Sequence, residues 1–588
     1  MPLPNLLATK NGRLAAFFCL YVTEGIPLGF AGVAVATQLR RQDVGPAEIG
    51  AFVGSFYLPW AFKWAFGPII DVFGSERLGR RRGWILITQV LMALTLLSTV
   101  LLRLPDQLWL FTAVLLVHNT FGAAQDVAID ALACNTLLEN ERGIANGVMF
   151  AGANIGIMIG GSGVLFLVPY FGFQSTFYFV AGAILLVTMV IVLPMKEPAA
   201  PARQAVVGSR LRSAGREMHE FAVSSFRSFL GTRGAFSGVF FALLPIGAMC
   251  LGLTLQSNLA VELGLTDDQV AWLNLWSAIV SAICCVLGGF LSDRFGRRKT
   301  LFVYIALMGL PVLYLMNMLT HYGWIMPVSI TDPNRPVVPA ALVTALWIAS
   351  LVYSMINGLM YGTRSAIFMD VTNPAVAATQ FTAYMALMNI VIAYSATWQG
   401  IAVEAWGYPR TMLIDAIFGV VCLAVLPFMR KLPQGKQQFT DAAAPSRARA
   451  AGCILALLSF AWLPYRIWHD SFGAAQPIAG TFFTLVFVIS GVFLLAGGAV
   501  LGDSARRLSR AGVWIAPLLF LMYARYYVDN IASWFGSVVG PKAFTVGAEV
   551  VFRTIPLLAG VLLLRLALQS WRELTVDRTG EGRVTGAL

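Results

Sequence analysis

The stretch Gly67-Pro68-Ile69-Ile70-Asp71, followed by Arg80-Arg81-Arg82, decides the fold because its layout returns about 220 residues later. The second copy reads Gly288-Gly289-Phe290-Leu291-Ser292-Asp293-Arg294-Phe295-Gly296-Arg297-Arg298-Lys299. In both copies an apolar run ends in glycine, an aspartate follows, and a basic cluster precedes the next apolar run. Two such turns, equally placed in two apolar halves, predict a duplicated membrane domain.

The composition is that of a protein that crosses a membrane many times. Of 588 residues, 58% are hydrophobic and only 12% are charged, and the mean hydropathy is +0.74. A soluble core of this size could not use so much apolar sequence. The net charge of +12 does not point to nucleic acid, because the Lys and Arg residues lie mostly in alternate loops, as topology determinants do.

The motifs of ATP-driven, metal-dependent and hydrolytic proteins are missing from the sequence. It contains no P-loop, His-Glu-x-x-His or Cys-x-x-Cys pattern, and its seven cysteines are scattered through apolar segments without metal-ligand spacing. We therefore predict that the protein is not an enzyme and that it needs no cofactor or metal.

Apolar segments of about 20 residues, the length that spans a bilayer, predict an all-α protein with about sixteen spans. Six lie in each half, and four more follow a polar linker. We place them near 14–37, 48–70, 84–103, 107–133, 144–168, 174–195, 235–260, 268–291, 300–320, 340–368, 377–402, 409–429, 451–468, 478–500, 512–534 and 545–568.

The basic loops suggest both the domain boundaries and the orientation. Most of them fall on one side if both termini are cytoplasmic, although Arg40 and Arg41 are exceptions. The expected parts are two six-helix bundles, a cytoplasmic linker between them, a second linker, four appended spans and a cytoplasmic tail. We predict the first bundle at 1–195, the cytoplasmic linker at 196–233 and the second bundle at 234–430. The second linker is expected at 431–450, the appended spans at 451–570 and the cytoplasmic tail at 571–588.

At the paired turns the sequence resembles the major facilitator superfamily, whose signature loop reads Gly-x-x-x-Asp-Arg-x-Gly-Arg-Arg. The second copy fits closely. The first has Val72 where the arginine belongs, and residues 75–79 form an insertion before its arginines. The resemblance implies a major facilitator fold of two six-helix bundles, here followed by about four extra transmembrane helices.

Within that superfamily, four stretches resemble the AmpG-type permeases. They are Gly25-Ile26-Pro27-Leu28-Gly29, Lys63-Trp64, Gly79-Arg80-Arg81-Arg82-Gly83-Trp84, and Gln125-Asp126 with Asp130. The resemblance implies a bacterial inner-membrane permease, which we expect to be a monomer, that imports anhydro-muropeptides, the sugar-peptides of wall recycling, with protons. The acetyl-CoA transporter branch shares much of this pattern, so import of another large anionic solute, such as an acyl-CoA or a siderophore, stays open. A non-transporting membrane scaffold or sensor is a further alternative.

Three carboxyl groups inside apolar segments are the candidate proton carriers. Glu24 lies halfway along the first span, where a lone carboxylate is costly if it is charged. It either carries protons or is permanently paired with Lys63 of the second span. Asp126 and Asp130 are four residues apart, so they share one helix face, where their repulsion favours a proton on one of them.

Polar side chains of the second half complete the candidate substrate site. Matching the two halves places Tyr361 opposite Asp126, and Arg364 follows one turn later. Arg364 can hold a carboxylate of a peptide stem in a bidentate pair, or it can pair with Asp126 or Asp130. The candidate substrate-binding residues are Lys63, Gln125, Asn154, Gln256, Tyr361, Arg364 and Trp398.

The repeated turns are candidate gates rather than binding sites. Asp71 and Asp293 lie at predicted cytoplasmic helix ends, where each can pair with arginines or with a helix terminus when the inside closes. We expect the second copy to be the more conventional latch. The candidate gating residues are Asp71, Arg80, Arg81, Arg82, Asp293, Arg294, Arg297 and Arg298.

One further pair of charges lies in the appended spans. Arg525 and Asp529 are four residues apart, on one helix face, and Arg553 in the next span is a possible partner. We predict a structural ion pair there rather than a functional site.

Overall fold

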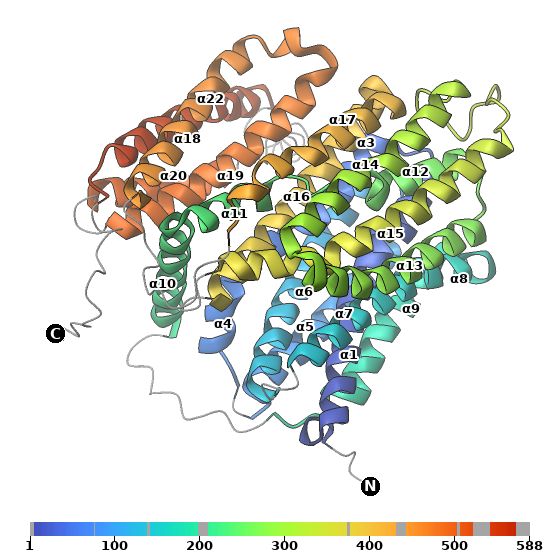
Figure 1. The fold of residues 1–588 in the computed structure, drawn as a ribbon, viewed down its shortest axis with the longest axis horizontal. Coiled ribbons are helices and arrows are strands. Elements are labelled where there is room, and N and C mark those ends of the chain that lie inside the picture. The colour runs from blue at the N-terminus through green and yellow to red at the C-terminus, as the bar shows by residue number, and fades with distance from the viewer. Residues whose placement is uncertain are drawn as a thin grey trace. The chain divides into compact units, whose positions relative to one another are not determined.

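A computed structural model describes residues 5–75, 77–137, 142–197, 210–372, 377–430, 443–501, 506–520, 522 and 541–571 of the chain. The regular structure of these residues is helical, as the ribbon of Figure 1 shows. Thirteen of the described helical segments are long and apolar enough to cross a membrane. This confirms the predicted all-α polytopic class.

The first half contains a helix interrupted by a π-turn, a broken helix and four further spans. Lys63 lies in the break of the second span, between a helix that ends at Ala61 and one that begins at Phe66. The elements are α1 (Lys10–Gly29), η2 (Phe30–Val35), α2 (Ala36–Arg41), α3 (Pro46–Ala61), η3 (Lys63–Ala65), α4 (Phe66–Val72), α5 (Arg80–Ser98), α6 (Leu108–Thr136), α7 (Arg142–Met158), η6 (Ile159–Gly163), α8 (Val164–Phe171), α9 (Phe173–Val187) and η7 (Thr188–Val192).

The second half also contains a broken span, the seventh. Its elements are α11 (Arg233–Leu243), η8 (Cys250–Gly252), α12 (Thr254–Glu262), α13 (Asp267–Phe295), α14 (Arg297–His321), α15 (Ala340–Val371), α16 (Ala377–Trp406) and α17 (Tyr408–Val421).

One helix precedes the second half and four follow it. Helix α10 (Arg210–Gly231) lies in the predicted linker, and the appended helices are α18 (Ala444–Ile467), α19 (Gln476–Leu501), α20 (Arg506–Phe520) and α22 (Pro541–Ala567).

The two broken spans and the short helix α20 explain why the described residues form thirteen helices of membrane-spanning length rather than the predicted sixteen. The predicted spans at 48–70 and 235–260 are each divided into shorter helices, and 512–534 lies partly outside the described residues. In the seventh span Pro245 cannot donate a hydrogen bond, and Gly247 adopts a φ of +86°. The helix therefore ends at Leu243 and resumes at Thr254.

Close packing of α1 on α7 holds the first bundle together. A Cβ added to Gly160 would lie 1.9 Å from the carbonyl oxygen of Ile26, and one added to Gly156 would lie 2.3 Å from that of Val22. Only glycine permits such contact between two helix backbones. The glycines of the fifth span thus fix the position of the helix that carries Glu24.

The chain divides into two compact units. One comprises Met1–Met218, Phe240–Met369 and Thr382–Pro427, and it holds most of both predicted six-helix bundles. The other comprises His219–Val239, Asp370–Phe381 and Phe428–Leu588, with the appended helices.

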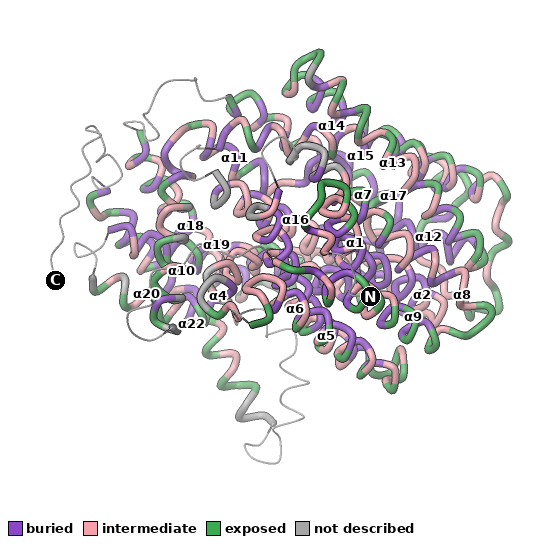
Figure 2. The backbone as a smooth tube through the Cα atoms, turned by 90° about the horizontal axis from the view of Figure 1, so that it is seen from below, coloured by how far each residue is buried: buried purple, intermediate pink, exposed green. Residues whose placement is uncertain are grey.

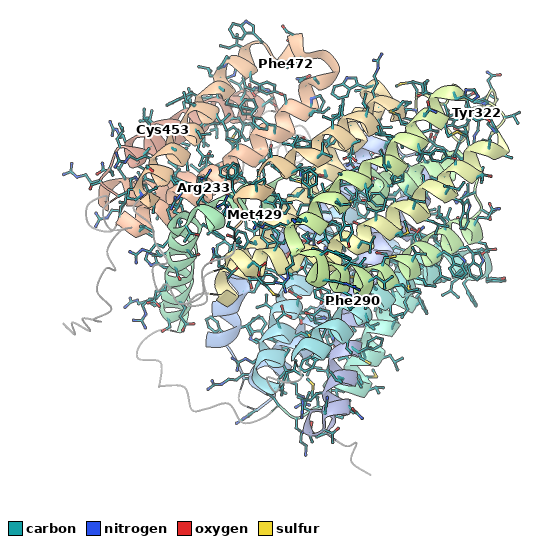
Figure 3. All side chains as sticks on the ribbon, viewed as in Figure 1. Arg233, Phe290, Tyr322, Met429, Cys453 and Phe472 are labelled. Atoms are coloured by element: carbon teal, nitrogen blue, oxygen red, sulfur yellow. The ribbon has the colours of Figure 1, made fainter. Side chains whose placement is uncertain are left out.

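The appended helices of the second unit have an aromatic core of their own. Trp462 is fully buried and donates from Nε1 to the carbonyl of Phe552 at 2.8 Å. Arg233 and Met429, labelled in Figure 3, belong to the same unit, and the Arg233 guanidinium stacks on the neighbouring Phe428 ring at 4.5 Å.

A charged cluster in this unit contains one residue of the ion pair predicted for the appended spans. Arg553 donates to Glu549 at 2.9 Å, and Arg466 binds the same carboxylate. Arg525 and Asp529 lie outside the described residues.

Candidate transport site

The break in the second span places Lys63 next to a carboxylate of α6. Lys63 Nζ lies 2.9 Å from Asp126 Oδ2, and the two side chains are only 14% and 3% exposed. An ion pair shielded in this way is expensive to break from one side, because the remaining charge would be buried without a partner. Lys63 is thus salt-bridged to Asp126, a residue other than the Glu24 considered from the sequence.

The other two predicted proton carriers surround this pair. The Glu24 carboxyl interacts electrostatically with both Asp126 and Lys63, and its Oε2 has no hydrogen-bond partner among the described residues. Asp130 accepts a hydrogen bond from the Tyr21 hydroxyl at 2.6 Å. Three carboxyl groups around one ammonium cannot all be ionised in a low-dielectric site, so we expect at least one to hold a proton.

A chain of neutral hydrogen bonds fixes the helices around the cluster. Gln125 and Gln89 both donate to Thr23 Oγ1, at 2.9 and 3.1 Å. Thr188 in turn donates to Gln89 Oε1 at 2.7 Å. This chain joins α1, α5, α6 and η7 one residue away from Glu24 and Asp126. Of its members, only Gln125 is among the candidate residues predicted from the sequence.

A cavity lies where the unwound seventh span meets α15. The space between its lining atoms, part of which is open to solvent, is about 610 Å³. Tyr361 and Arg364 both line it, and the Arg364 guanidinium stacks over the Tyr361 ring at 3.9 Å. The lining residues are Tyr57, Leu244, Ile246, Met249, Gly252, Leu253, Met308, Tyr353, Asn357, Met360, Tyr361, Arg364, Met388, Val391 and Ile392.

Asp415 of α17, which is not among the candidates predicted from the sequence, stabilises the unwound segment. Its Oδ2 accepts hydrogen bonds from the backbone N–H groups of Met249 and Cys250 at 2.8 and 3.0 Å. Its Oδ1 accepts one from Gln399 Nε2 at 2.7 Å. The signal was available, because Asp415 is a carboxylate inside the predicted span 409–429 and an intramembrane charge is a candidate by default.

For three of the predicted substrate residues, the described contacts involve neither the charged cluster nor the cavity. Asn154 donates to the carbonyl of Phe150 in its own helix at 2.9 Å. Trp398 packs against Phe418, with ring centroids 6.5 Å apart. Gln256 is buried in α12. None of the three lines the cavity described above, so their role in substrate binding stays a prediction.

The first basic turn binds within its own bundle. Arg82 donates to the carbonyls of Val192 and Leu193, at 2.9 and 2.5 Å, where the sixth span ends. Glu197 Oε2 accepts the backbone N–H groups of Arg81 and Arg82 at 2.9 and 3.2 Å and so caps α5. Arg80, at the start of α5, is half-buried. These contacts join two helices of one half.

At the second basic turn, Arg294 and Arg298 are exposed and Arg297 is half-buried. Arg294 lies 5.7 Å from the ring centroid of Phe295. The side chains of Asp71 and Asp293 lie outside the described residues. The gating role of both turns stays a prediction.

The two halves are joined by ion pairs at the far end of the first span, which we call the ionic latch (Arg40, Arg41, Asp43, Glu262 and Asp267). Arg40 lies 2.7 Å from Glu262, and both side chains are almost fully buried. Arg41 lies 2.5 Å from Asp267. Since α1 to α2 form one membrane-length helix, this latch lies at the opposite end of that span from the N-terminus.

Asp43 ties the latch to the loop between α14 and α15. It accepts hydrogen bonds from the backbone N–H of Ile330 at 3.1 Å and from the hydroxyls of Ser329 and Thr331. Burial opposes ionisation of Asp43, but these hydrogen bonds and Arg40 outweigh it and hold its pKa below the usual value. At neutral pH the latch therefore contains an ionised Asp43.

Comparison with known proteins places this geometry in a transporter family. The family model described as Major Facilitator Superfamily matches residues 14–257 and 235–564. The chain is 24% identical to the anhydromuropeptide permease of Escherichia coli strain K12 over 425 residues, which cover 71% of this chain and 80% of that protein.

Solved structures share the fold at low sequence identity. A POT family transporter in complex with 5-aminolevulinic acid aligns with a TM-score of 0.53 and 11% identity, over 71% of this chain and 95% of that one. A D-xylose-proton symporter aligns with a TM-score of 0.51 and 13% identity, over 72% and 98%. Together with the family match, they confirm that the chain is a multi-pass membrane transporter and not an enzyme. The chain belongs to the Major Facilitator Superfamily.

Proposed function

We propose that the protein imports anhydro-muropeptides across the bacterial inner membrane, coupled to protons and by alternating access. The buried cluster of Glu24, Lys63, Asp126 and Asp130 carries the proposal, because a transporter without a nucleotide site needs an ion-driven element at membrane depth. The similarity to an anhydromuropeptide permease supports the substrate class.

In this proposal the cluster holds and releases one proton during the cycle. Protonation of Asp126 would remove the charge that fixes Lys63, which lies 2.9 Å away. Lys63 could then pair with Glu24 or with an anionic group of the substrate. Because both carboxylates compete for one ammonium, the occupancy of the proton site and the position of the helix break at Lys63 become linked.

The substrate would bind in the cavity beside the unwound seventh span. Arg364 supplies a guanidinium for the carboxylates of a peptide stem, and the Tyr361 ring beneath it supplies a stacking surface. The Arg364 Nε has no hydrogen-bond partner among the described residues, so it can donate to a ligand. A peptide-bearing sugar satisfies both requirements.

Uptake of labelled anhydro-muropeptide into proteoliposomes with an imposed pH gradient tests the function. We expect uptake that depends on the gradient, and we expect Asp126→Asn to remove that dependence. The matched control is Asn274→Ala, which removes a polar side chain that donates to the carbonyl of Val270 in its own helix at 2.9 Å. Gradient-independent uptake would reject proton coupling, whereas gradient-driven uptake of an acyl-CoA or a siderophore instead would reject the substrate.

The orientation and assembly are part of the same proposal. We infer that both termini are cytoplasmic and that the protein works as a monomer in the lipid bilayer. The latch would then lie at the outer face, because residues 40 and 41 are at the other end of the first span from the N-terminus.

A further inference from the structure

Helix α12 is buried along its whole length, as Figure 2 shows, although five of its nine residues are polar. Helices buried on all sides are ordinarily apolar. Glu262, at its end, is accounted for by the ionic latch, but the remaining polar residues are not. They are Thr254, Gln256, Ser257 and Asn258.

Asn258 is the least explained of these side chains. It is 0% exposed, and neither its Oδ1 nor its Nδ2 has a hydrogen-bond partner in the described part of the chain. Thr254 lies one turn earlier on the same face and is also 0% exposed, with an unpartnered Oγ1. Buried polar groups in native proteins are nearly always hydrogen-bonded, so a pair of exceptions on one helix face needs a cause.

The helix that faces them shows the same exception. Helix α2 of the first half packs against α12. On α2, Thr37 is 0% exposed and its Oγ1 has no partner among the described residues. Thr37 lies one turn before Arg40, and Asn258 lies one turn before Glu262. Since Arg40 and Glu262 pair at 2.7 Å at the ends of these two helices, Thr37 and Asn258 lie at a similar depth on the seam between the halves.

We propose that Asn258, Thr254 and Thr37 form a binding site for the hydroxyl and acetamido groups of a sugar, which opens when the ionic latch separates. An asparagine amide supplies one acceptor and two donors, and a hydroxyl supplies both, which matches neutral polyhydroxylated groups. The three side chains carry no charge, so they complement the sugar end of the substrate and not its carboxylates. This proposal rests on the proposed function for the identity of the sugar.

The two-state character of a transporter explains why the site is unpartnered in this conformation. Its three side chains are hydrogen-bonded by the sugar or by water when the halves part, and they are buried without hydrogen-bond partners once the substrate has moved inward. The site would therefore act on entry alone, whereas Arg364 would act on the substrate in the cavity.

Cysteine labelling tests the exposure of the site without reference to transport. The seven native cysteines are replaced in the full-length protein, and a single cysteine is introduced at Asn258 or Thr254. This variant is then treated with a membrane-impermeant maleimide added on the side of the ionic latch. We expect labelling to rise about tenfold when Glu262→Gln and Arg41→Ala weaken the latch. Leu20→Cys, in the core of the first bundle, is the control and should stay unlabelled. Unchanged labelling at both 254 and 258 would overturn the proposal.

The ligand is tested with the anhydro-disaccharide that lacks a peptide. Its addition should slow labelling at Asn258→Cys in the weakened-latch protein about fivefold. No protection at either position, with labelling intact, would overturn the sugar assignment. If the wild-type protein proves not to transport muropeptides, the proposed function fails while the labelling result still stands, so the two failures are distinguishable.

Transport kinetics supply a readout that a purely structural role would not change. Thr254→Val removes one hydroxyl at constant shape and should raise KM for entry about tenfold, while exchange from the opposite side is unchanged. Thr411→Val is the matched control, because that hydroxyl already bonds the carbonyl of Gly407 in its own helix at 2.9 Å. An equal KM from both sides in Thr254→Val would contradict the proposal.

Discussion

The two halves of the transport core hold a break in a membrane helix in different ways. In the first half the break carries Lys63, whose charge is neutralised by Asp126 of another helix. In the second half the break exposes backbone N–H groups, and Asp415 accepts two of them. The first arrangement depends on charge and can respond to protons. The second depends on hydrogen-bond acceptors and can hold a fixed shape around the cavity.

The largest expected effect on stability and uptake comes from removing one partner of the Lys63–Asp126 ion pair at the break in the second span. Lys63→Ala leaves an uncompensated buried charge on Asp126, so it should lose about 3–5 kcal/mol of stability and nearly all uptake. Asp126→Ala should lose nearly all uptake but less stability, because the Glu24 carboxyl also interacts with Lys63. Thermal unfolding in detergent and uptake in proteoliposomes measure the two effects. The double variant Lys63→Met/Asp126→Leu should recover stability but not transport. Single variants as stable as wild type would show that the pair is solvated.

The second prediction compares the two aspartates directly. Asp126→Asn should abolish the pH dependence of uptake, whereas Asp415→Asn should keep it and retain activity within about threefold, because an amide oxygen still accepts both N–H groups. Gln399 can turn so that its Oε1, which has no described partner, accepts from the new amide. Asp415→Ala should lower uptake about tenfold or more, since two buried N–H groups lose their acceptor. Loss of pH dependence in Asp415→Asn would mean that both breaks respond to protons.

A smaller effect is expected at the cavity itself. Arg364→Ala should raise KM for a peptide-bearing substrate about tenfold to a hundredfold. Arg364→Lys should recover only part of the affinity, because an ammonium keeps the charge but cannot bind a carboxylate through two parallel bonds. Uptake of the peptide-free anhydro-disaccharide is the control and should change little. If both substrates lose affinity equally, Arg364 positions helix α15 instead of binding the peptide.

The smallest effect concerns the latch outside the membrane core. Because the pKa of Asp43 is held below its usual value, its contribution is present at neutral pH and is lost as pH falls through that lowered pKa, below the value of about 3.9 for a free aspartate. Thermal unfolding of wild type and Asp43→Asn should differ at pH 7, and the difference should shrink as the pH falls below about 3.9. A difference that stays the same as the pH is lowered would show that the shape of the Asp43 side chain matters rather than its charge.

Much of the candidate site could be predicted from local sequence. Glu24, Asp126 and Asp130 are carboxylates inside apolar runs, and Tyr361 and Arg364 were found from the internal repeat; the structure brings these into one cluster and one cavity. Asp415 carried the same kind of signal. Its partners could not be predicted, since the backbone groups of Met249 and Cys250 become donors only where the helix unwinds.

The sequence by itself determined the class of the protein, because bilayer thickness and the position of charges act along the chain and need no knowledge of contacts. The repeated basic turn likewise determined the family. Only the tertiary structure decided that Lys63 pairs with Asp126, that Arg40 closes on Glu262, and that Asn258 is buried without a partner. The two ion pairs join residues that are 63 and 222 positions apart in the chain. They depend on which helix faces meet, and no local pattern encodes that choice.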